Sequence, residues 1–205
     1  MKLPTIVPTL PIRIAVFASG TGSNARNLVA HFKNRPGAKV TLIASNRADA
    51  PVLTMARQEG IATLLISRHA LYASDELRIS LLDAGIDFIV LAGFLWLIPP
   101  ALVASFHRRI VNIHPALLPR FGGKGMYGHH VHEAVLQSGE RYTGITIHYV
   151  DEKYDEGDII FQSQCMISPT DDVTAIARKV QALEHKHFPM VVEQLITTLN
   201  GHAPY

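Results

Sequence analysis

Short, almost wholly apolar segments alternate with longer amphipathic segments along the first half of this chain. The apolar segments, rich in β-branched side chains, lie at residues 12–18, 39–45, 62–67 and 86–94. Segments with helical periodicity follow them at residues 25–34, 51–60, 73–84 and 100–109. Strands that are apolar on both faces are typical of a parallel sheet covered by helices. The alternation therefore predicts an α/β fold, Rossmann-like, with a mostly parallel central sheet flanked by helices.

The last third of the chain departs from this alternation. Residues 143–152 alternate apolar and polar side chains with a period of two, and residues 158–167 form a second expected strand. The short connection between them predicts a C-terminal antiparallel strand pair. A long C-terminal helix is expected to follow and to end at Gly201, with Pro189 kinking or splitting it near residue 188.

Length and composition limit the remaining possibilities. A chain of 205 residues suits one domain over 1–205, with residues 1–11 an irregular lead-in that lacks the features of a signal peptide. The net charge is only +2 and no run of lysine and arginine occurs, so no nucleic-acid partner is expected. The sequence contains no stretch of about eighteen apolar residues, so no membrane span is predicted. The lone cysteine, Cys165, fits a reducing cytoplasm and the role of a small buried hydrophobe.

The segment SGTGSN at residues 19–24 joins the first expected strand to the first expected helix. Glycines let a backbone approach an anion closely, and a helix N-terminus offers free N–H groups and a positive dipole end. Ser23 and Asn24 are suitable N-caps. The dinucleotide fingerprint is incomplete because Ala25 occupies the place of its third glycine. The pattern favours phosphate binding, with a plain tight turn as the alternative.

Asn112 and His114 stand at the carboxyl end of the short apolar strand Ile110-Val111. In open parallel sheets, ligands bind just beyond the carboxyl ends of the strands. An asparagine amide can donate to a developing oxyanion, and a histidine ring exchanges its proton near neutral pH. Residues two apart in an extended chain point to the same side. The pair is therefore a candidate catalytic site, although a turn-forming Asn and a satisfied, partly buried His would look the same.

Three further segments carry open alternatives. The loop around Trp96 is either core packing or a wall for a flat ring. The acidic bend 151–158 is either a solvated turn or brings a carboxylate to His114, where it would raise the histidine pKa. Glu184, on a largely apolar helix, either binds a ligand amine or has a structural partner.

The glycine-rich loop 120–131 carries Arg120 and Lys124 and is a plausible lid over a neighbouring site. The histidines that follow, His129, His130 and His132, lack the spacing of metal ligands one turn apart, and no cysteine accompanies them. We therefore expect no metal site, and we expect His132 to begin a helix.

Six ordered segments resemble those of the glycinamide ribonucleotide formyltransferases, a family of folate-dependent enzymes. They are SGTGSN at 19–24, SNRADA at 45–50, VLAGFLWLIP at 90–99, NIHPALLPRFGG at 112–123, GITIHYVDEKYDEGDIIFQ at 144–162 and VQALEHKHFP at 180–189. The resemblance covers residues 12 to about 196. It implies transfer of a formyl group from the cosubstrate 10-formyltetrahydrofolate to the amine of 5'-phosphoribosylglycinamide, in de novo purine synthesis and without a metal.

The resemblance also implies roles for individual residues. Asn112, His114 and Asp155 would be the catalytic trio, in which Asn112 and protonated His114 stabilise a tetrahedral oxyanion while Asp155 helps to move protons through a water. The substrate-binding residues would be Gly22, Ser23 and Asn24 at the phosphate and Glu184 at the amine or glycinamide portion. The residues lining the pterin site would be Leu95, Trp96, Leu97, Ile98, Asn112 and the bend 151–155.

Two family arginines have no evident match. Many relatives place one where this chain has Trp96, and residues 67–78 offer no clear counterpart of the arginine near the folate tail. We expect small-molecule substrates as the only partners, a monomer or homodimer, and a cytoplasmic location.

The Asn-x-His…Asp trio also resembles that of methionyl-tRNA formyltransferases and formyltetrahydrofolate hydrolases. The first would need an added basic domain, and the second usually carries an N-terminal regulatory domain. A non-enzymatic nucleotide-binding module is the alternative from another class. It would keep SGTGSN but would have no need of the trio.

Overall fold

The computed structural model describes residues 10–201, so most of the expected lead-in over 1–11 lies outside the described residues. Its strands are β1 (Ile12–Phe17), β2 (Ala38–Ser45), β3 (Ala62–Leu65), β4 (Phe88–Leu91), β5 (Ile110–His114), β6 (Tyr142–Tyr149) and β7 (Ile159–Met166). Its helices are α1 (Ser23–Phe32), α2 (Pro51–Gln58), α3 (Arg68–Tyr72), α4 (Glu76–Asp83), α5 (Pro100–Ser105), α6 (His129–Gln137) and α7 (Val173–Gly201).

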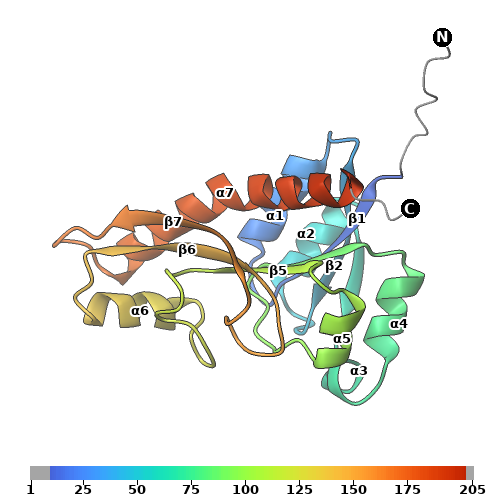
Figure 1. The fold of residues 1–205 in the computed structure, drawn as a ribbon, viewed down its shortest axis with the longest axis horizontal. Helices are drawn as coiled ribbons and strands as arrows, with labels where there is room; N and C mark the ends of the chain where they lie inside the picture. The colour runs from blue at the N-terminus through green and yellow to red at the C-terminus, as the bar shows by residue number, and fades with distance from the viewer. Residues whose placement is uncertain (1–9, 202–205) are drawn as a thin grey trace, which may run out of the picture.

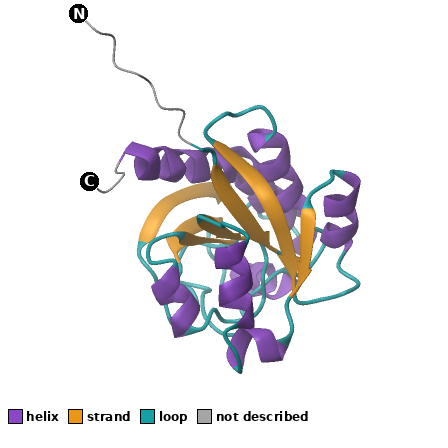
Figure 2. Ribbon diagram, turned by 90° about the vertical axis from the view of Figure 1, so that its right-hand side faces the viewer, coloured by secondary structure: helices purple, strands orange, loops and turns teal. Residues whose placement is uncertain are grey.

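The described strands form one sheet in the order β3-β2-β1-β4-β5-β6-β7. The pairs from β3 to β5 are all parallel, whereas β5–β6 and β6–β7 are antiparallel. Helices cover both faces of this sheet, and the long helix α7 runs along one of them beside α1 (Figures 1 and 2). The predicted α/β fold, with its antiparallel C-terminal strand pair and long C-terminal helix, is confirmed.

Strand β1 shows why the first apolar segment is hydrophobic on both faces. Ile14 and Val16 pack into one buried cluster with side chains of α1, α2 and α7. Ala15 and Phe17 point the other way, into a cluster with side chains of α3, α4 and α5. Because both faces of β1 are buried, its sequence does not alternate apolar and polar side chains as a half-buried strand does.

Two expected helices differ in the structure. The helix expected at 73–84 is present as the shorter α4, and the short helix α3, which was not expected, precedes it. Ser67 caps α3 by accepting a hydrogen bond from the Ala70 N–H at 3.0 Å. Helix α6 begins at His129 rather than at His132.

Cys165 also differs from the expectation. It lies on the edge strand β7 and is only partly buried, rather than a fully buried hydrophobe.

Helix α7 continues through Pro189, so the expected split near residue 188 is wrong. A proline lacks the N–H that would bond the carbonyl four residues earlier, here that of His185. The side chain of Asn27 on α1 donates to that carbonyl at 2.7 Å. A tertiary hydrogen bond thus replaces the missing helical one.

No helix among residues 10–201 has the length and apolar character that a membrane span requires.

The topology also determines where a ligand could bind. The chain moves from β1 outward to β2 and β3, and then returns to β4 on the opposite side of β1. The connections that leave β1 and β4 therefore diverge, which opens a crevice at their carboxyl ends. The segments 19–24, 93–98 and 112–115 all lie at this edge of the sheet.

Candidate functional site

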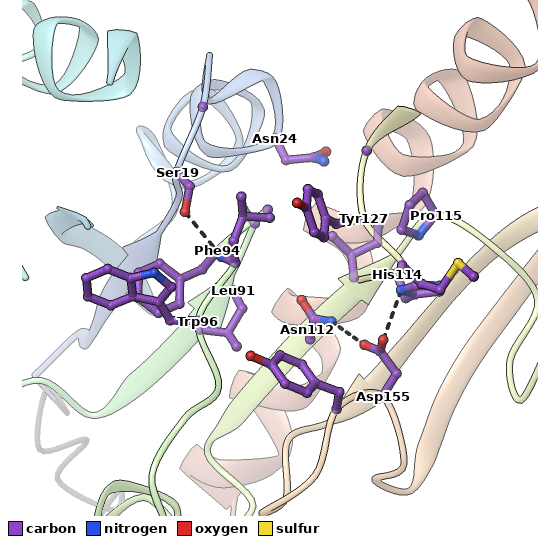
Figure 3. A pocket seen from close by; sticks show the side chains of 18 of the residues that line it. Ser19, Asn24, Leu91, Phe94, Trp96, Asn112, His114, Pro115, Tyr127 and Asp155 are labelled. Carbon is purple, nitrogen blue, oxygen red and sulfur yellow. Dashed lines mark hydrogen bonds and ion pairs between the residues drawn. The ribbon is translucent and has the colours of Figure 1, made fainter. Parts of the chain in front are cut away.

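A cavity of about 1100 Å³ opens at the carboxyl ends of β1, β4 and β5. It is lined by residues 19–24, 91–98, 112–115, 123–128 and 153–155, and by one face of the first half of α7. Apart from Asp151 and Glu152 of the bend, every residue proposed from the sequence as catalytic or binding lines this cavity. Figure 3 shows Asn112, His114 and Asp155 together on one side, with Asn24, Phe94 and Trp96 around the remainder.

The backbone before α1 forms a cradle for an anion. Gly22 is the N-cap residue, with a left-handed backbone (φ 75°), and no side chain caps the helix. Ser23 and Asn24 are therefore the first helical residues and not caps. The N–H groups of residues 22–25 have no acceptor among residues 10–201. Free N–H groups at the positive end of a ten-residue helix suit a phosphate.

The glycine at position 22 is required for two reasons. Its φ lies in the left-handed region that favours glycine. A Cβ built on it would lie 2.3 Å from Cγ2 and 2.7 Å from Cβ of Val52 on α2. The cradle can therefore keep this shape only with glycine at this position.

Helix α7 closes the cradle from the side. The Glu184 Oε2 atom accepts a hydrogen bond from the Asn24 side chain at 2.9 Å, and Gln181 lies 3.3 Å from the Ser23 hydroxyl. Glu184 thus has the structural partner that was one of the two alternatives. Burial raises the pKa of Glu184 above its usual value, and the Asn24 hydrogen bond only partly opposes this. The Asn24 Oδ1 atom is buried and has no hydrogen-bond partner within the described part of the chain.

The carboxylate of Asp155 joins the proposed catalytic groups. Its Oδ1 lies 3.3 Å from Asn112 Nδ2, and its Oδ2 lies 3.4 Å from His114 Nδ1. The Gly123 N–H also donates to Oδ2, at 2.9 Å. Asp155 has a left-handed backbone (φ 57°), which is uncommon outside glycine and turns its side chain inward from the bend. The acidic bend is therefore not merely a solvated turn.

The environment of His114 differs from the expectation. Burial lowers the pKa of His114 below its usual value, although Asp155 and the Phe121 carbonyl act to raise it. The carboxylate acts in the expected direction, but the desolvation of a ring that is only 3% exposed outweighs it. The Nε2 atom lies 2.7 Å from the Phe121 carbonyl, so both ring nitrogens face acceptors. A protonated ring would satisfy both contacts.

Asp155 remains an anion beside this ring. Burial alone would raise its pKa, but contacts with His148, His114 and the Gly123 N–H together lower it below the usual range. The site therefore holds a carboxylate that can stabilise a proton arriving on His114.

An apolar wall faces these polar groups. Phe94 and Trp96 meet edge to face, with ring centroids 6.3 Å apart. The Ser19 hydroxyl accepts from the Leu95 N–H at 3.2 Å, and the Tyr72 hydroxyl donates to the Leu97 carbonyl at 3.0 Å. Trp96 packs against the core, as one interpretation expected, and it also lines the cavity. Its role as a wall for a flat ring stays a prediction.

Arg68 was missed by the sequence analysis. It begins α3, its guanidinium lies 4.7 Å from the centre of the Trp96 ring, and it lines the cavity. An arginine within residues 67–78 thus does reach the site. The only sequence signal was its position just after a parallel strand, where the carboxyl-end loops meet.

Part of the acidic bend and two of the three clustered histidines lie away from the cavity wall, whereas His132 lines the cavity. Within the bend, residues 153–155 line the cavity, whereas Asp151 and Glu152 do not. His129 and His130 lie 3.0 and 3.7 Å from carboxylate oxygens of Glu133 on their own helix. Among residues 10–201, no three His, Cys, Asp or Glu side chains are grouped as a metal site would require.

Comparison with known proteins identifies the family. The model of the formyl transferase family matches residues 12–192. The chain belongs to the formyl transferase family. The match spans the whole described sheet and every residue of the site.

Individual formyl transferases are similar over most of this chain. The chloroplastic phosphoribosylglycinamide formyltransferase of Arabidopsis thaliana is 45% identical over 188 residues, which cover 88% of this chain and 64% of that protein. The corresponding protein of Vigna unguiculata is 41% identical over 89% of this chain and 60% of its own length. The chain thus spans less than two thirds of the length of these curated relatives.

Solved structures of formyl transferases match nearly end to end. Glycinamide ribonucleotide transformylase 1 from Geobacillus kaustophilus has a TM-score of 0.82 at 35% identity, over 91% of this chain and 99% of that one. The enzyme of the same name from Symbiobacterium toebii has a TM-score of 0.83 at 31% identity, over 92% and 89%.

Proposed function

We propose that this formyl transferase moves the formyl group of 10-formyltetrahydrofolate to the amine of 5'-phosphoribosylglycinamide, a step of purine biosynthesis. One observation carries the proposal: the trio of Asn112, His114 and Asp155 and a free N–H cradle line the same cavity. A cradle for phosphate and an acid–base group for acyl transfer are what this pair of substrates requires. The names of the similar proteins agree with this reaction.

The ribonucleotide would bind across the α1 side of the cavity. Its phosphate would meet the N–H groups of Gly22, Ser23 and Asn24. Glu184 would then face the glycinamide portion. A buried carboxylate with a raised pKa is favoured by a ligand that brings an N–H donor to it.

The folate would occupy the apolar side. Leu95, Trp96, Leu97 and Ile98 line that part of the cavity, where ring stacking and backbone hydrogen bonds can hold a pterin. Arg68 stands beside Trp96 at this end of the cavity. Its charge suits the carboxylates of the folate tail.

The chemistry follows from the positions of the trio. The amine attacks the formyl carbon, and the carbonyl oxygen becomes negative. The Asn112 N–H that faces Asp155 makes a long contact of 3.3 Å, so it can be shared with the formyl oxygen as charge develops. His114 accepts the proton that leaves the attacking nitrogen and returns it, by way of a water, to the departing folate nitrogen as the bond between that nitrogen and the formyl carbon breaks.

Asp155 assists this proton movement. Its carboxylate lies 3.4 Å from His114 Nδ1 and stabilises the ring while the ring is charged. A water between this carboxylate, the attacking amine nitrogen and the departing folate nitrogen would relay protons. No metal takes part in this proposed scheme. Small molecules are its only partners, and cytoplasmic location and a monomer or homodimer remain predictions.

The test is a spectrophotometric assay of deformylation of 10-formyl-5,8-dideazafolate, with and without the ribonucleotide. Deformylation that depends on the ribonucleotide is the expected result. Deformylation without it would replace the proposal by a hydrolase. Binding of the ribonucleotide with no deformylation would replace it by a binding module.

Gly22→Ala is expected to raise the KM for the ribonucleotide by roughly tenfold or more and to lower Tm. The left-handed backbone costs a non-glycine residue about 1–2 kcal/mol, and the new methyl group would overlap Val52. Steady-state kinetics and thermal denaturation measure the two effects. Gly20→Ala is the matched control, because nothing lies within 4 Å of its added Cβ. Equal effects of the two variants would argue against the cradle.

Glu184→Gln is expected to raise the KM for the ribonucleotide by roughly tenfold, the effect of losing a hydrogen bond to a charged group, with little change in kcat. It should also leave Tm at pH 8 equal to or above that of the wild type. The raised pKa means that ionised Glu184 disfavours the folded state at pH 8, and glutamine removes that charge. The difference should vanish as pH falls to the usual value of 4.5, where the carboxyl group is protonated.

Glu193→Gln on the same helix is the control for this variant. Glu193 pairs with Arg35 and His31 outside the cavity, so its loss should lower Tm and leave the KM unchanged. A Tm loss for Glu184→Gln that is larger at pH 8 than at pH 4.5 would contradict the prediction.

A further inference from the structure

His148 lies directly across the sheet from Asn112. The antiparallel pairing of β5 and β6 places these two residues opposite each other, and His148 is 2% exposed. The pairing of β6 with β7 shifts register between Ile147 and His148. Such a bulge changes the direction of a side chain locally. The histidine is therefore fixed beside the catalytic amide, although the mechanism above gives it no role.

The hydrogen bonds of His148 determine where its ring proton sits. The Nδ1 atom lies 2.8 Å from the Tyr149 carbonyl, which can only accept a hydrogen bond. Nδ1 therefore carries the hydrogen and, in the uncharged ring, Nε2 carries a lone pair. Nε2 lies 3.1 Å from Asn112 Nδ2 and 3.5 Å from Asp155 Oδ1. The uncharged ring accepts a hydrogen bond from the Asn112 amide at Nε2.

This acceptor fixes the orientation of the Asn112 amide. One N–H of the amide points to His148, and the other points to Asp155 Oδ1 at 3.3 Å. A half-turn of the amide would place its oxygen against the lone pair of Nε2 and against a carboxylate oxygen. Both contacts would then be repulsive. The two neighbours thus ensure that the N–H edge of Asn112 faces the trio.

We propose that His148 is a positioning residue for formyl transfer, which fixes the orientation of the planar Asn112 amide so that the N–H facing Asp155 is also directed at the developing charge on the formyl oxygen. This inference rests on the proposed function. Without the His148 acceptor, both N–H groups compete for Asp155, and neither is held in the direction of the developing charge. The contribution of His148 therefore appears in the transition state rather than in substrate binding.

The test compares His148→Leu with His148→Gln, whose side-chain oxygen can still accept from Asn112. His148→Leu is expected to lower kcat by roughly ten- to hundredfold, the effect of a misplaced catalytic group, with the KM of both substrates nearly unchanged. His148→Gln should recover most of that loss. His148→Asn is the second variant if the His148→Leu protein does not fold. Its side chain is too short to reach Asn112, so its kcat should fall by as much as that expected for His148→Leu.

A double-mutant cycle separates positioning from a general effect on the fold. In the Asn112→Ala background, His148→Leu is expected to cause no further loss of kcat, since its partner is absent. A purely structural role would give the same loss in both backgrounds. Thr143→Val is the control on the same strand. The Thr143 hydroxyl is buried outside the site and has no hydrogen-bond partner among residues 10–201. It should leave kcat unchanged.

The outcomes distinguish the two proposals. Absence of ribonucleotide-dependent transfer in the wild-type protein would overturn the proposed function and this role with it. If the wild-type protein is active, two results would overturn the role of His148 alone. One is an unchanged kcat in His148→Leu, and the other is additive losses in the double-mutant cycle.

Discussion

His114→Ala is expected to lower kcat by roughly a hundredfold to ten-thousandfold, the usual contribution of a general acid–base group. The ring is the one titratable group of the trio whose proton can move near neutral pH, and its Nδ1 lies 3.4 Å from Asp155 Oδ2. Alanine removes the ring that accepts the proton from the attacking nitrogen. Because the ring acts during the chemical step, the KM of both substrates should change by less than about threefold.

Steady-state assays of ribonucleotide-dependent deformylation measure this effect, and thermal denaturation confirms that the variant is folded. His107→Ala is the control, since His107 is exposed just before β5 and does not line the cavity. A folded His114→Ala protein with near-normal kcat would remove His114 from the mechanism.

The location of the site could be predicted from the sequence because it depends on strand ends. Asn112 and His114 follow an apolar run and stand two residues apart, so any parallel sheet would place them on one face at its carboxyl edge. The glycines of residues 19–24 indicate the anion cradle, because they too follow directly on the carboxyl end of a parallel strand. These inferences need only local patterns and one rule of topology.

Asp155 illustrates the limit of such patterns. The residues alone left the bend open as a solvated turn, and only the resemblance selected Asp155 over Asp151. The selection depends on a left-handed backbone at Asp155 and on the Gly123 N–H from a distant loop. A non-glycine residue with positive φ is rarely evident from its own side chain, because the surrounding fold imposes it.

Three features required the tertiary structure. The sign of the His114 pKa shift depends on how completely β5 and the loop at Phe121 exclude water. Arg68 becomes a site residue only when α3 places it over Trp96. His148 faces Asn112 only in the observed strand register, and a slip of one residue would turn it to the other face. Each feature is a contact between segments far apart in the chain.

Asn112→Ala is expected to lower kcat by roughly a hundredfold to a thousandfold, the typical loss when one oxyanion donor is removed. The amide lies between His148 Nε2 at 3.1 Å and Asp155 Oδ1 at 3.3 Å, so its N–H groups are already oriented before substrate binds. That orientation is what a donor needs to stabilise charge without reorganising. The KM of both substrates should change little, because the contact strengthens only as the formyl oxygen becomes negative.

The measurement is the same assay on Asn112→Ala, His114→Ala and the double variant. The two side chains act on one transition state, so the double variant should lose much less than the product of the single losses. Strictly multiplicative losses would mean that the residues act independently and would contradict the mechanism. A rise in KM at constant kcat for Asn112→Ala would instead assign the amide to substrate binding, since an oxyanion donor acts on the chemical step.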